Sequence, residues 1–407
     1  MGDILFLAHR IPFPPDRGDK IRAHHLLKHL AGFAPVHVGC FWETEKDREA
    51  EGDLAQVAAS HCLLRRAKPL ALAGVEAVLS ARPVSLTAFH HRTIAEWVTR
   101  TIAERDITTI FVFSGQMGQY IPQDFAGQVI VDLCDVDSVK FEDYAEAGER
   151  VWLNRREGRL LRQEEERLAH RADTTLLISE NEKAVFQTRL GNAAGARIAA
   201  IGNGIDAGFF DPSVVEPHGE IASRPGPHFV FTGQMDYRPN EAAALWTIEH
   251  FMPAVHTRYP QAEYHVVGRN PTAALLTIAN APGVTVWGEV PDVRPFLAAA
   301  DIALTPLTIA RGVQNKVLEA MAMELPVLLT EQAATGIAAQ DGQDWLVAPA
   351  DADAMVERFG ALWSDRTAHH TMGKAARRFV LEHHSWPAML APLDAMVAAS
   401  AEARDAA

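Results

Sequence analysis

The sequence has little cysteine, no long apolar run and no excess of positive charge. Its three cysteines, Cys40, Cys62 and Cys134, are far apart and odd in number. This is typical of core thiols and excludes a disulfide framework or a zinc site. The longest apolar stretches, such as Leu70–Leu79, are interrupted well short of a membrane span. No basic region precedes the short apolar run at the N-terminus, so we expect no signal peptide. We expect a cytoplasmic protein, with any contact to the cytoplasmic face of the inner membrane being peripheral.

The charge is negative and unevenly spread. Over 407 residues the formal net charge is −14. Lys and Arg number 25 against 28 Asp and Glu in residues 1–205, and 13 against 24 in residues 206–407. An acidic chain is a poor general binder of nucleic acid, so we expect no nucleic-acid partner. The near-neutral first half could present a local basic face to anionic lipid or to a phosphorylated acceptor, although ordinary scatter of surface charge explains the same counts.

Several common ligand motifs are also missing. The sequence contains neither a Walker loop nor a G-x-G-x-x-G after a strand. His25 and His29 stand four residues apart on a predicted helix, a spacing that could hold a metal. No third ligand is evident, and a solvated helix face explains the pair more simply. We therefore expect no metal and no cofactor.

Apolar runs of strand length alternate with amphipathic helical stretches along the chain. The predicted strands are Ile4–Ala8, Val36–Phe41, Thr109–Phe113, Gln128–Leu133, Thr174–Ile178, Ala199–Ile201, His228–Thr232, Glu263–Val267, Val284–Trp287, Ile302–Thr305 and Pro326–Thr330. This alternation favours an α/β fold with parallel sheets covered by helices on both faces. One long, highly charged helix is predicted from about Asp143 to Arg171.

A stretch rich in Pro, Gly and Ser, Asp211–Pro227, predicts a domain boundary. We expect two doubly wound, Rossmann-like domains that face a central cleft. The first comprises residues 1–210 and the second residues 211–385. The last helix, residues 386–407, has no obvious packing site in the second domain, so we expect it to cross back to the first.

The most informative segment is Ala310–Ala322, a short glycine-containing loop that leads into a helix. A helix start carries unbonded N–H groups and a partial positive charge, to which Arg311 and Lys316 add two full charges. Such a place suits an anion, and a diphosphate in particular. Glu319 lies about one turn further along, where a carboxylate can accept hydrogen bonds from a ribose. An ordinary helix with a basic start is the alternative.

Six segments, spread over essentially the whole chain, share their order and spacing with one known family. They are Arg17–Lys20, Ile201–Asp206 with Phe210–Pro212, Phe231–Asn240, His265–Gly268, Trp287–Phe296 and Ala310–Thr330. Together they resemble the retaining glycosyltransferases of family four, which have the GT-B fold. Within that family the chain is most similar to the sugar transferases of exopolysaccharide (PEP-CTERM-type) loci.

The resemblance implies a retaining, metal-independent hexosyltransferase. Its donor would be a nucleotide-diphosphate sugar and its acceptor a glycan or a polyprenyl-linked molecule, in exopolysaccharide or cell-envelope glycan biosynthesis. Glu289 and Val290 would lie along the base, Glu319 would bind the ribose, and Arg311 and Lys316 the diphosphate. The full donor-binding set that the resemblance implies is Gly233, Asp236, Arg238, Glu289, Val290, Arg311, Gly312, Val313, Lys316 and Glu319.

The reacting centre would use residues of both halves. The resemblance implies catalytic roles for Gly18, Arg311 and Lys316, and the position of Asp132 and Asp135 at the end of a predicted strand facing the expected cleft adds these two acids. Gly18 would let the backbone approach the leaving phosphate and the acceptor, although a plain strand-to-helix turn is the alternative. Asp132, Asp135 or Asp137, or the turn Ser114–Gln116, would orient the acceptor hydroxyl or take its proton. For the three acids, helix capping and loop hydrogen bonds are the alternative.

Asp135 and Asp137 also form an Asp-x-Asp, the metal-binding pair of the other large glycosyltransferase fold. We do not favour a metal site of this kind, because the segments that indicate nucleotide binding all lie in the second half of the chain.

The chain departs from the family pattern at two positions. Arg311 stands where the family usually has an acidic residue that contacts the donor sugar, and Gln234 stands where it often has Arg. We infer that positive charge has moved from the first loop to Arg311 and Lys316, which still neutralises the diphosphate. Two other functions stay open: a GT-B-fold sugar-nucleotide epimerase, and a non-catalytic nucleotide-binding subunit.

Overall fold

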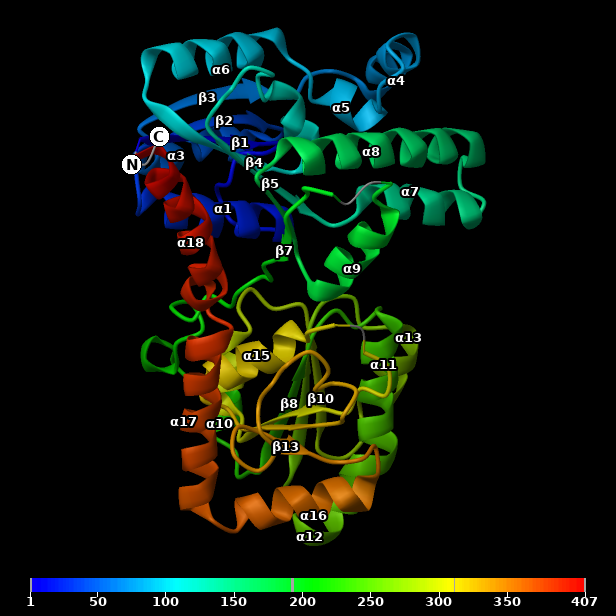
Figure 1. The fold of residues 1–407 in the computed structure, drawn as a ribbon. Helices are drawn as coiled ribbons and strands as arrows, with labels where there is room; N and C mark the ends of the chain where they lie inside the picture. The colour runs from blue at the N-terminus through cyan, green and yellow to red at the C-terminus, as the bar shows by residue number, and fades with distance from the viewer. Residues whose placement is uncertain (1, 192–193, 311, 406–407) are drawn as a thin grey trace. The chain divides into compact units, whose positions relative to one another are not determined.

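The computed structural model of the protein describes residues 2–191, 194–310 and 312–405. The chain forms two compact units, Met1–Asn203 with Met389–Ala407 and Gly204–Ala388. Figure 1 shows both units, coloured along the chain. The domain limits expected from the sequence differ from these units by a few residues at each junction. Each unit is described by itself.

The first unit is built on a parallel sheet with the strand order β3-β2-β1-β4-β5-β6-β7 among its described residues. The strands are β1 (Asp3–Ala8), β2 (Val36–Trp42), β3 (Ser60–Arg65), β4 (Ile107–Phe113), β5 (Gln128–Cys134), β6 (Thr174–Leu177) and β7 (Ile198–Ala200). In β1 the side chains from Ile4 to Ala8 are all 0% exposed. A strand covered on both faces needs an unbroken apolar run of this kind.

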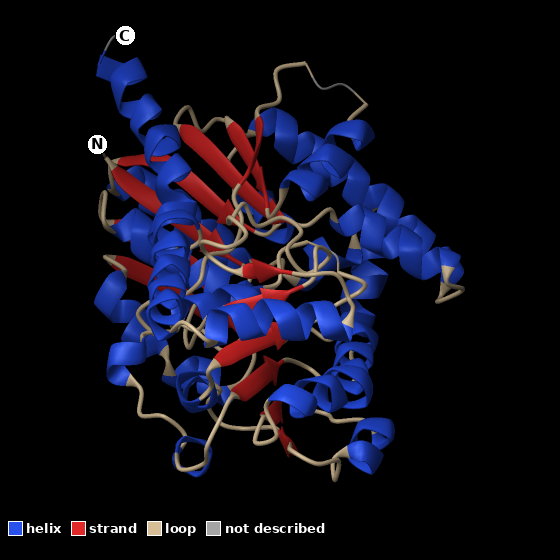
Figure 2. Ribbon diagram, turned by 90° about the horizontal axis from the view of Figure 1, so that it is seen from below, coloured by secondary structure: helices blue, strands red, loops and turns tan. Residues whose placement is uncertain are grey.

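Helices connect these strands and cover both faces of the sheet (Figure 2). They are α1 (Gly18–Ala31), α2 (Glu45–Glu49), α3 (Glu51–Val57), α4 (Leu70–Leu79), α5 (Val84–Ala88), α6 (Arg92–Glu104), the 3₁₀ helix η1 (Gly115–Tyr120), α7 (Asp137–Glu146), α8 (Val151–Arg171) and α9 (Glu180–Arg189). Helix α6 shows the usual pattern, in which Ile94, Trp97, Val98 and Thr101 are buried at helical spacing.

The second unit repeats the same scheme, with the strand order β10-β9-β8-β11-β12-β13 in its described part. Its strands are β8 (His228–Thr232), β9 (Glu263–Val267), β10 (Val284–Gly288), β11 (Ile302–Thr305), β12 (Val327–Leu329) and β13 (Leu346–Val347), all parallel to their neighbours. Its helices are the 3₁₀ helix η2 (Pro212–Val214), α10 (Gly219–Ala222), α11 (Arg238–Trp246), the π-helical turn η3 (Thr247–Phe251), α12 (Met252–Arg258), α13 (Ala273–Ile278), α14 (Arg294–Ala299), α15 (Asn315–Ala322), α16 (Ala352–Trp363) and α17 (Arg366–His383).

Two doubly wound parallel sheets confirm the fold class expected from the sequence. In each sheet the chain first adds strands on one side of the opening strand and then on the other. The change of side occurs between β1 and β4 in the first unit and between β8 and β11 in the second. Ligands of open α/β sheets bind beyond the carboxyl ends of the strands at such switch points. These two edges are therefore the places to examine for function.

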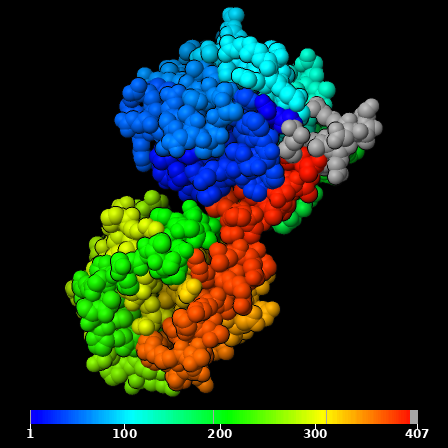
Figure 3. Space-filling model, turned by 90° about the vertical axis from the view of Figure 1, so that its left-hand side faces the viewer, coloured from blue at the N-terminus to red at the C-terminus, as the bar shows by residue number. Residues whose placement is uncertain are grey.

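The last helix, α18 (Trp386–Asp405), confirms the expected return of the chain to the first unit. The Nε2 atom of His29 lies 2.7 Å from a carboxylate oxygen of Asp394. The side-chain amide of Gln128 donates to the carbonyl of Met396 at 2.6 Å. In the space-filling view the red surface of α18 adjoins the dark blue surface of the first unit (Figure 3). Within the described chain, every helix is too short or too polar to cross a bilayer.

Two secondary-structure expectations were wrong. The single helix expected from about Asp143 to Arg171 is a helical hairpin, in which α7 and α8 run side by side (Figure 1). Gly148 has a φ of 85° and Arg150 a φ of 38°, and these left-handed residues turn the chain between the two helices. Strands β3 and β13 were missed. β3 is a half-buried edge strand that opens with Ser60 and His61, and β13 has only 2 residues.

Candidate functional site

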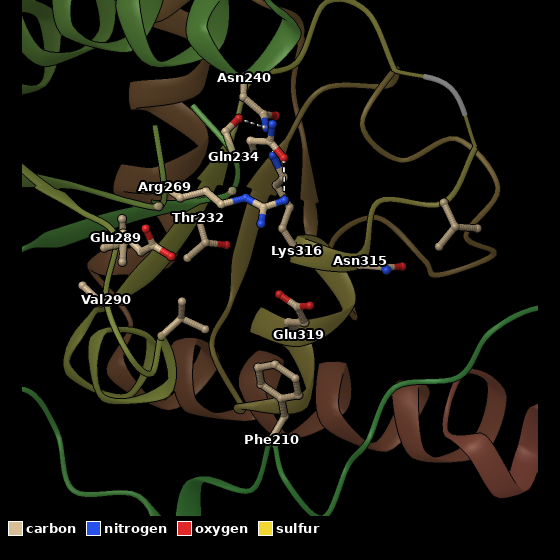
Figure 4. Close-up of a pocket in the computed structure, with 15 residues that line it drawn as sticks. Phe210, Thr232, Gln234, Asn240, Arg269, Glu289, Val290, Asn315, Lys316 and Glu319 are labelled. Carbon is tan, nitrogen blue, oxygen red and sulfur yellow. Dashed lines mark hydrogen bonds between the residues drawn. The ribbon is translucent and has the colours of Figure 1, made fainter. Parts of the chain in front are cut away.

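A cavity of about 560 Å³ lies in the second unit, at the carboxyl edge of its sheet. Its walls come from the loops after β8, β9 and β10 and from the start of α15, so it occupies the switch point. The lining residues are Phe210, Thr232, Gly233, Gln234, Asn240, Val267, Gly268, Arg269, Glu289, Val290, Val293, Val313, Asn315, Lys316 and Glu319. Figure 4 shows these side chains. Six of them, Gly233, Glu289, Val290, Val313, Lys316 and Glu319, were expected from the sequence.

Two glycines shape the floor of the cavity where β8 and β9 end. A Cβ atom on Gly268 would stand 1.6 Å from the carbonyl oxygen of Gly233, which no side chain can tolerate. A Cβ atom on Gly233 would stand 2.9 Å from the amide nitrogen of Asn240 and 3.0 Å from Nζ of Lys316. The glycines therefore let the backbone lie directly against the groups that carry the charge of the site.

Lys316 is the central cation of the cavity. Its hydrogen-bond and ring partners are neutral, and the carboxyl group of Glu319 interacts with its charge through space. Its ammonium group donates a hydrogen bond to the side-chain oxygen of Asn240 and lies 4.4 Å from the ring centroid of Phe231. Asn240 is itself fixed, because its side-chain nitrogen donates to the carbonyl of Gln234 at 2.9 Å (Figure 4). Burial lowers the pKa of Lys316 to about 8. A partly buried ammonium with an amide and a ring as its neighbours favours an anion from outside the chain.

The start of α15 adds to this anion site. Gln314, its N-cap residue, makes no capping hydrogen bond through its side chain, so the first turn of α15 has no side-chain cap. Glu319 lies one turn along and points into the same cavity below Lys316 (Figure 4). Burial raises the pKa of its carboxyl group, with Lys316 opposing the shift. A carboxylate in this position can accept hydrogen bonds from hydroxyl groups.

Sequence reasoning assigned no site role to five polar residues of the cavity, and two of them, Asn240 and Arg269, bear on its charge. Arg269 lines it and donates to the side-chain oxygen of Gln234 at 2.7 Å, so Arg269 is a second cation near Lys316. Asn240 lies within a segment that carries the family resemblance, but no role was assigned to it. A signal for Arg269 was present, because it follows β9 by two residues and adjacent parallel strands end at one edge of the sheet.

Other expected residues lie elsewhere. Asp236 and Arg238 are exposed and do not line the cavity, and the same holds for Gly312. Asp236 instead accepts a hydrogen bond from the side chain of Asn270 at 3.1 Å. Arg311, to which the sequence assigned both binding and catalysis, lies outside the described residues.

The residues expected at the reacting centre of the first unit differ from one another in burial. Gly18 is exposed and opens α1. Asp132 is 0% exposed and forms an ion pair with Arg22, 1% exposed, at 2.9 Å. Asp135 is exposed after β5. Only Gly18 and Asp135 are thus accessible to a ligand from solvent.

One group of potential metal ligands occurs among the described residues, formed by His228, Glu263 and His265. Its hydrogen bonds assign every imidazole proton. Trp287 donates to Nδ1 of His265 at 3.3 Å, so Nε2 of that ring carries the proton. Nε2 of His228 contacts the carbonyl of Arg224 at 3.1 Å and must donate to it, which leaves Nδ1 to accept from His265 at 3.2 Å.

These assignments leave neither ring a lone pair for a metal. Burial lowers the pKa of His265 to about 3, in keeping with a neutral ring. Glu263 is also paired with Arg224 at 3.2 Å. The group is therefore a hydrogen-bonded chain that joins β8, β9 and β10.

Comparisons with known proteins agree with this architecture. Residues 226–365 match the family model described as glycosyl transferases group 1. No curated protein matched the chain. A sucrose-phosphate synthase from Thermosynechococcus elongatus is similar at 18% identity and a TM-score of 0.59, covering 99% of this chain and 100% of that one.

Two further solved structures are similar over nearly their whole length. Anabaena HepE in complex with UDP has 13% identity and a TM-score of 0.60, covering 98% of this chain and 100% of that one. A glycosyltransferase from Rickettsia africae has 14% identity and a TM-score of 0.57, covering 97% of both chains. At these identities the likeness shows the fold alone. The comparisons thus show a chain with the GT-B fold, of which residues 226–365 match the group 1 glycosyl transferase model.

Proposed function

We propose that the protein transfers a sugar from a nucleotide-diphosphate sugar to a glycan or lipid-linked acceptor, with retention of configuration. The observation that carries the proposal is Lys316, an ammonium group with neutral partners beside an uncapped helix start, in a cavity at the switch point of a parallel sheet. The family match to residues 226–365 supports the same activity.

The chemistry follows from the leaving group. Breaking the bond between the sugar and the diphosphate leaves negative charge on the phosphate oxygens. Lys316, Arg269 and the N–H groups at the start of α15 would stabilise that charge in the transition state. The departing phosphate would then take the proton of the incoming hydroxyl on the same face of the sugar, which gives retention without a separate general base.

The rest of the cavity suits a nucleoside. Glu319 would accept hydrogen bonds from the ribose, while the backbone at Glu289 and Val290 would read the edge of the base. Phe210 and Val293 supply apolar surface nearby. HepE is known in complexes with UDP and with UDP-glucose, so we propose uridine as the first base to test and a hexose as the first sugar.

In the first unit, we propose that the Gly18 loop and Asp135 contact the acceptor. Asp135 suits this role better than Asp132, because Asp132 is buried against Arg22. The resemblance to transferases of exopolysaccharide loci supports a role in cell-envelope glycan synthesis at the cytoplasmic face of the membrane.

The proposal is tested with a thermal-shift panel of uridine, guanosine and adenosine diphosphate sugars, followed by turnover of the donor that stabilises the protein most. We expect one nucleotide series to stabilise the protein, and a product whose anomeric configuration, read by NMR, equals that of the donor. Inversion would overturn retention. A product isomeric with the donor would identify an epimerase, and binding without turnover on any acceptor would identify a non-catalytic subunit.

A further inference from the structure

Helix α4 exposes its large apolar side chains and buries its small ones. Ala73 and Ala77 are 0% exposed, whereas Val75 and Val78 are 57% exposed and Leu79 is 83% exposed. This is the reverse of an ordinary surface helix, which turns its bulkiest apolar residues to the core. In Figure 1, α4 lies beside α5 and above α8. A guanidinium nitrogen of Arg156 on α8 holds α4 in place by donating to the carbonyl of Ala77 at 2.6 Å.

Beside α4 lies a cavity of about 660 Å³, entirely within the first unit. Most of its wall is apolar and is supplied by α4, α5, α7 and α8. The apolar lining residues are Leu70, Ala71, Gly74, Val84, Ala88, Phe89, Phe141 and Leu153. A cavity of this size and lining accepts a hydrocarbon chain more readily than a hydroxyl-rich sugar.

The cavity wall and the exposed face of α4 form one apolar surface. At about 3.6 residues per turn, Leu70, Ala71 and Gly74 share one side of the helix and line the cavity. Leu72, Val75 and Leu79 share the outer side, and Val78 lies on the same side as Ala71 and Gly74. On the helix itself the one charged residue, Glu76, is paired with Lys68 at 2.7 Å. A long apolar chain could therefore pass from the cavity along α4 without meeting an unpaired charge on that helix.

The charged residues that line the cavity are Arg10, Arg66 and Arg150 against Glu43 and Glu157, which leaves a net positive charge. Arg10 and Arg66 share one carboxylate, Glu43, each through its Nε atom. With Arg17 and Asp19 included, the cluster has three guanidiniums against two carboxylates. Within the described chain, the side chain of Arg66 donates only through Nε, and its guanidinium lies 5.6 Å from the ring of Phe89.

The terminal nitrogens of Arg66 can therefore contact an anion such as a phosphate. The same cluster adjoins the loop where the acceptor is proposed to bind, because Arg10 donates to Asp19, the residue after Gly18, at 2.7 Å.

We propose that this cavity binds a lipid phosphate, with the anionic head at Arg10 and Arg66 and the hydrocarbon chain along α4. The role of this lipid phosphate as the acceptor rests on the proposed glycosyl transfer. Binding itself does not, because the cavity is formed by the first unit alone and the nucleotide cavity by the second. Charge complementarity and the continuous apolar surface together favour a lipid phosphate over an uncharged glycan. A second copy of the chain covering α4 is the competing occupant.

Gly74 offers a clean way to fill the cavity. A Cβ atom there meets no atom within 4 Å, so Gly74→Phe should place its ring in open space without disturbing the fold. Gly52 on α3 is the matched control, since it is also a helical glycine with no atom within 4 Å of its Cβ and it does not line the cavity. Arg66→Gln removes the charge of the head site.

The probe is dodecyl phosphate below its micelle concentration, titrated into the full chain by calorimetry, with inorganic phosphate and dodecyl maltoside as separate arms. We expect dodecyl phosphate to bind, and Gly74→Phe to weaken it about tenfold or more, since the apolar contacts are displaced. Gly52→Phe should bind like the original chain. Arg66→Gln should weaken dodecyl phosphate about tenfold through the lost charged contact and leave dodecyl maltoside unchanged.

Equal affinity in Gly74→Phe and the original chain would overturn the proposal. Inorganic phosphate that binds as tightly as dodecyl phosphate would do the same, by showing a simple anion site. The proposal would also be overturned if dodecyl phosphate does not bind and the protein forms a dimer that Leu79→Glu dissociates. Nucleotide affinity, measured on the same variants, reports the second unit independently, so a failure here leaves the donor site standing.

Discussion

The two units share the order of six strands, with β7 as an addition in the first unit, but they treat positive charge at the carboxyl edge of the sheet in opposite ways. In the first unit the cations are matched by carboxylates of the chain itself. Arg22 is paired with Asp132 at 2.9 Å, and Lys20 with Asp47 at 2.8 Å. In the second unit Lys316 contacts an amide and an aromatic ring.

The difference shows why the same fold can bind different ligands at equivalent edges. A cation that already has a carboxylate partner, such as Arg22, gains little from a further anion, so an anionic ligand of the first unit would depend on the terminal nitrogens of Arg66 and on apolar contacts. A buried ammonium with neutral partners gains much more from a diphosphate. The chemistry at each edge thus depends on which partners the chain supplies, and the topology fixes only the place.

The largest expected effect comes from breaking a carboxylate pair of the first unit. Asp132→Ala leaves Arg22 buried without its counter-charge, and we expect a loss of about 3–5 kcal/mol in the free energy of unfolding. Urea denaturation followed by circular dichroism measures it. Asp135→Ala, on an exposed residue of the same segment, is the control and should change stability by about 0.5 kcal/mol or less. Equal stability of the two variants would mean that the pair has no structural role.

Removing the cation of the second unit should affect binding instead of folding. Lys316→Ala deletes a charged hydrogen bond to the diphosphate, which costs about 1.5–3 kcal/mol, or roughly tenfold to hundredfold in affinity. Calorimetric titration with UDP measures the change. Lys374→Ala, at an exposed position of α17, is the control. Undiminished UDP affinity in Lys316→Ala would count against the proposed donor site.

A third variant converts the second edge to the chemistry of the first. Asn240→Asp keeps the shape of the side chain but gives Lys316 a carboxylate partner, so the diphosphate must compete with it. We expect UDP affinity to fall about tenfold, near 1.4 kcal/mol. Asn240→Ala separates the two causes, because it removes the hydrogen bond without adding charge. If Asn240→Asp bound UDP better than Asn240→Ala, the competition argument would be wrong.

The smallest effect is a pH dependence of binding. Burial lowers the pKa of Lys316 to about 8, and the proposed contact with UDP requires the protonated form. The affinity for UDP should therefore be highest well below this pKa, where Lys316 is fully protonated. It should decline as pH rises through the pKa, by about fourfold between pH 7 and pH 8.5. Lys316→Arg, which stays charged, should remove the decline over this range. A flat profile in the original chain would show that Lys316 does not titrate at the site.

The fold was largely predictable because strands covered on both faces need unbroken apolar runs. The bounds of β8, β9 and β11 agree with the prediction from the sequence. The helical hairpin was not predicted, because the charged segments on both sides of Gly148 have the pattern of one continuous helix. The turn depends on left-handed backbone at Gly148 and Arg150. Strand β3 was not predicted, because an edge strand needs few apolar residues and its sequence pattern is weak.

The candidate site was only partly predictable. Lys316 and Glu319 follow from helical spacing within one segment, which sequence reasoning handles well. The roles of Asn240 and Arg269 depend on which side chains reach across from neighbouring strands and helices. Asn240 contacts Lys316 from a position 76 residues away in the chain. Contacts between residues so far apart in the sequence depend on how the elements pack, and no local sequence pattern predicts them.

A crystal structure of the protein with UDP tests the central claim most directly. The account predicts the diphosphate against Lys316 at the start of α15, with the ammonium group turned from Asn240 toward a phosphate oxygen and the ribose at Glu319. A bound nucleotide elsewhere, with Lys316 still on Asn240 and the cavity filled only by solvent, would contradict it.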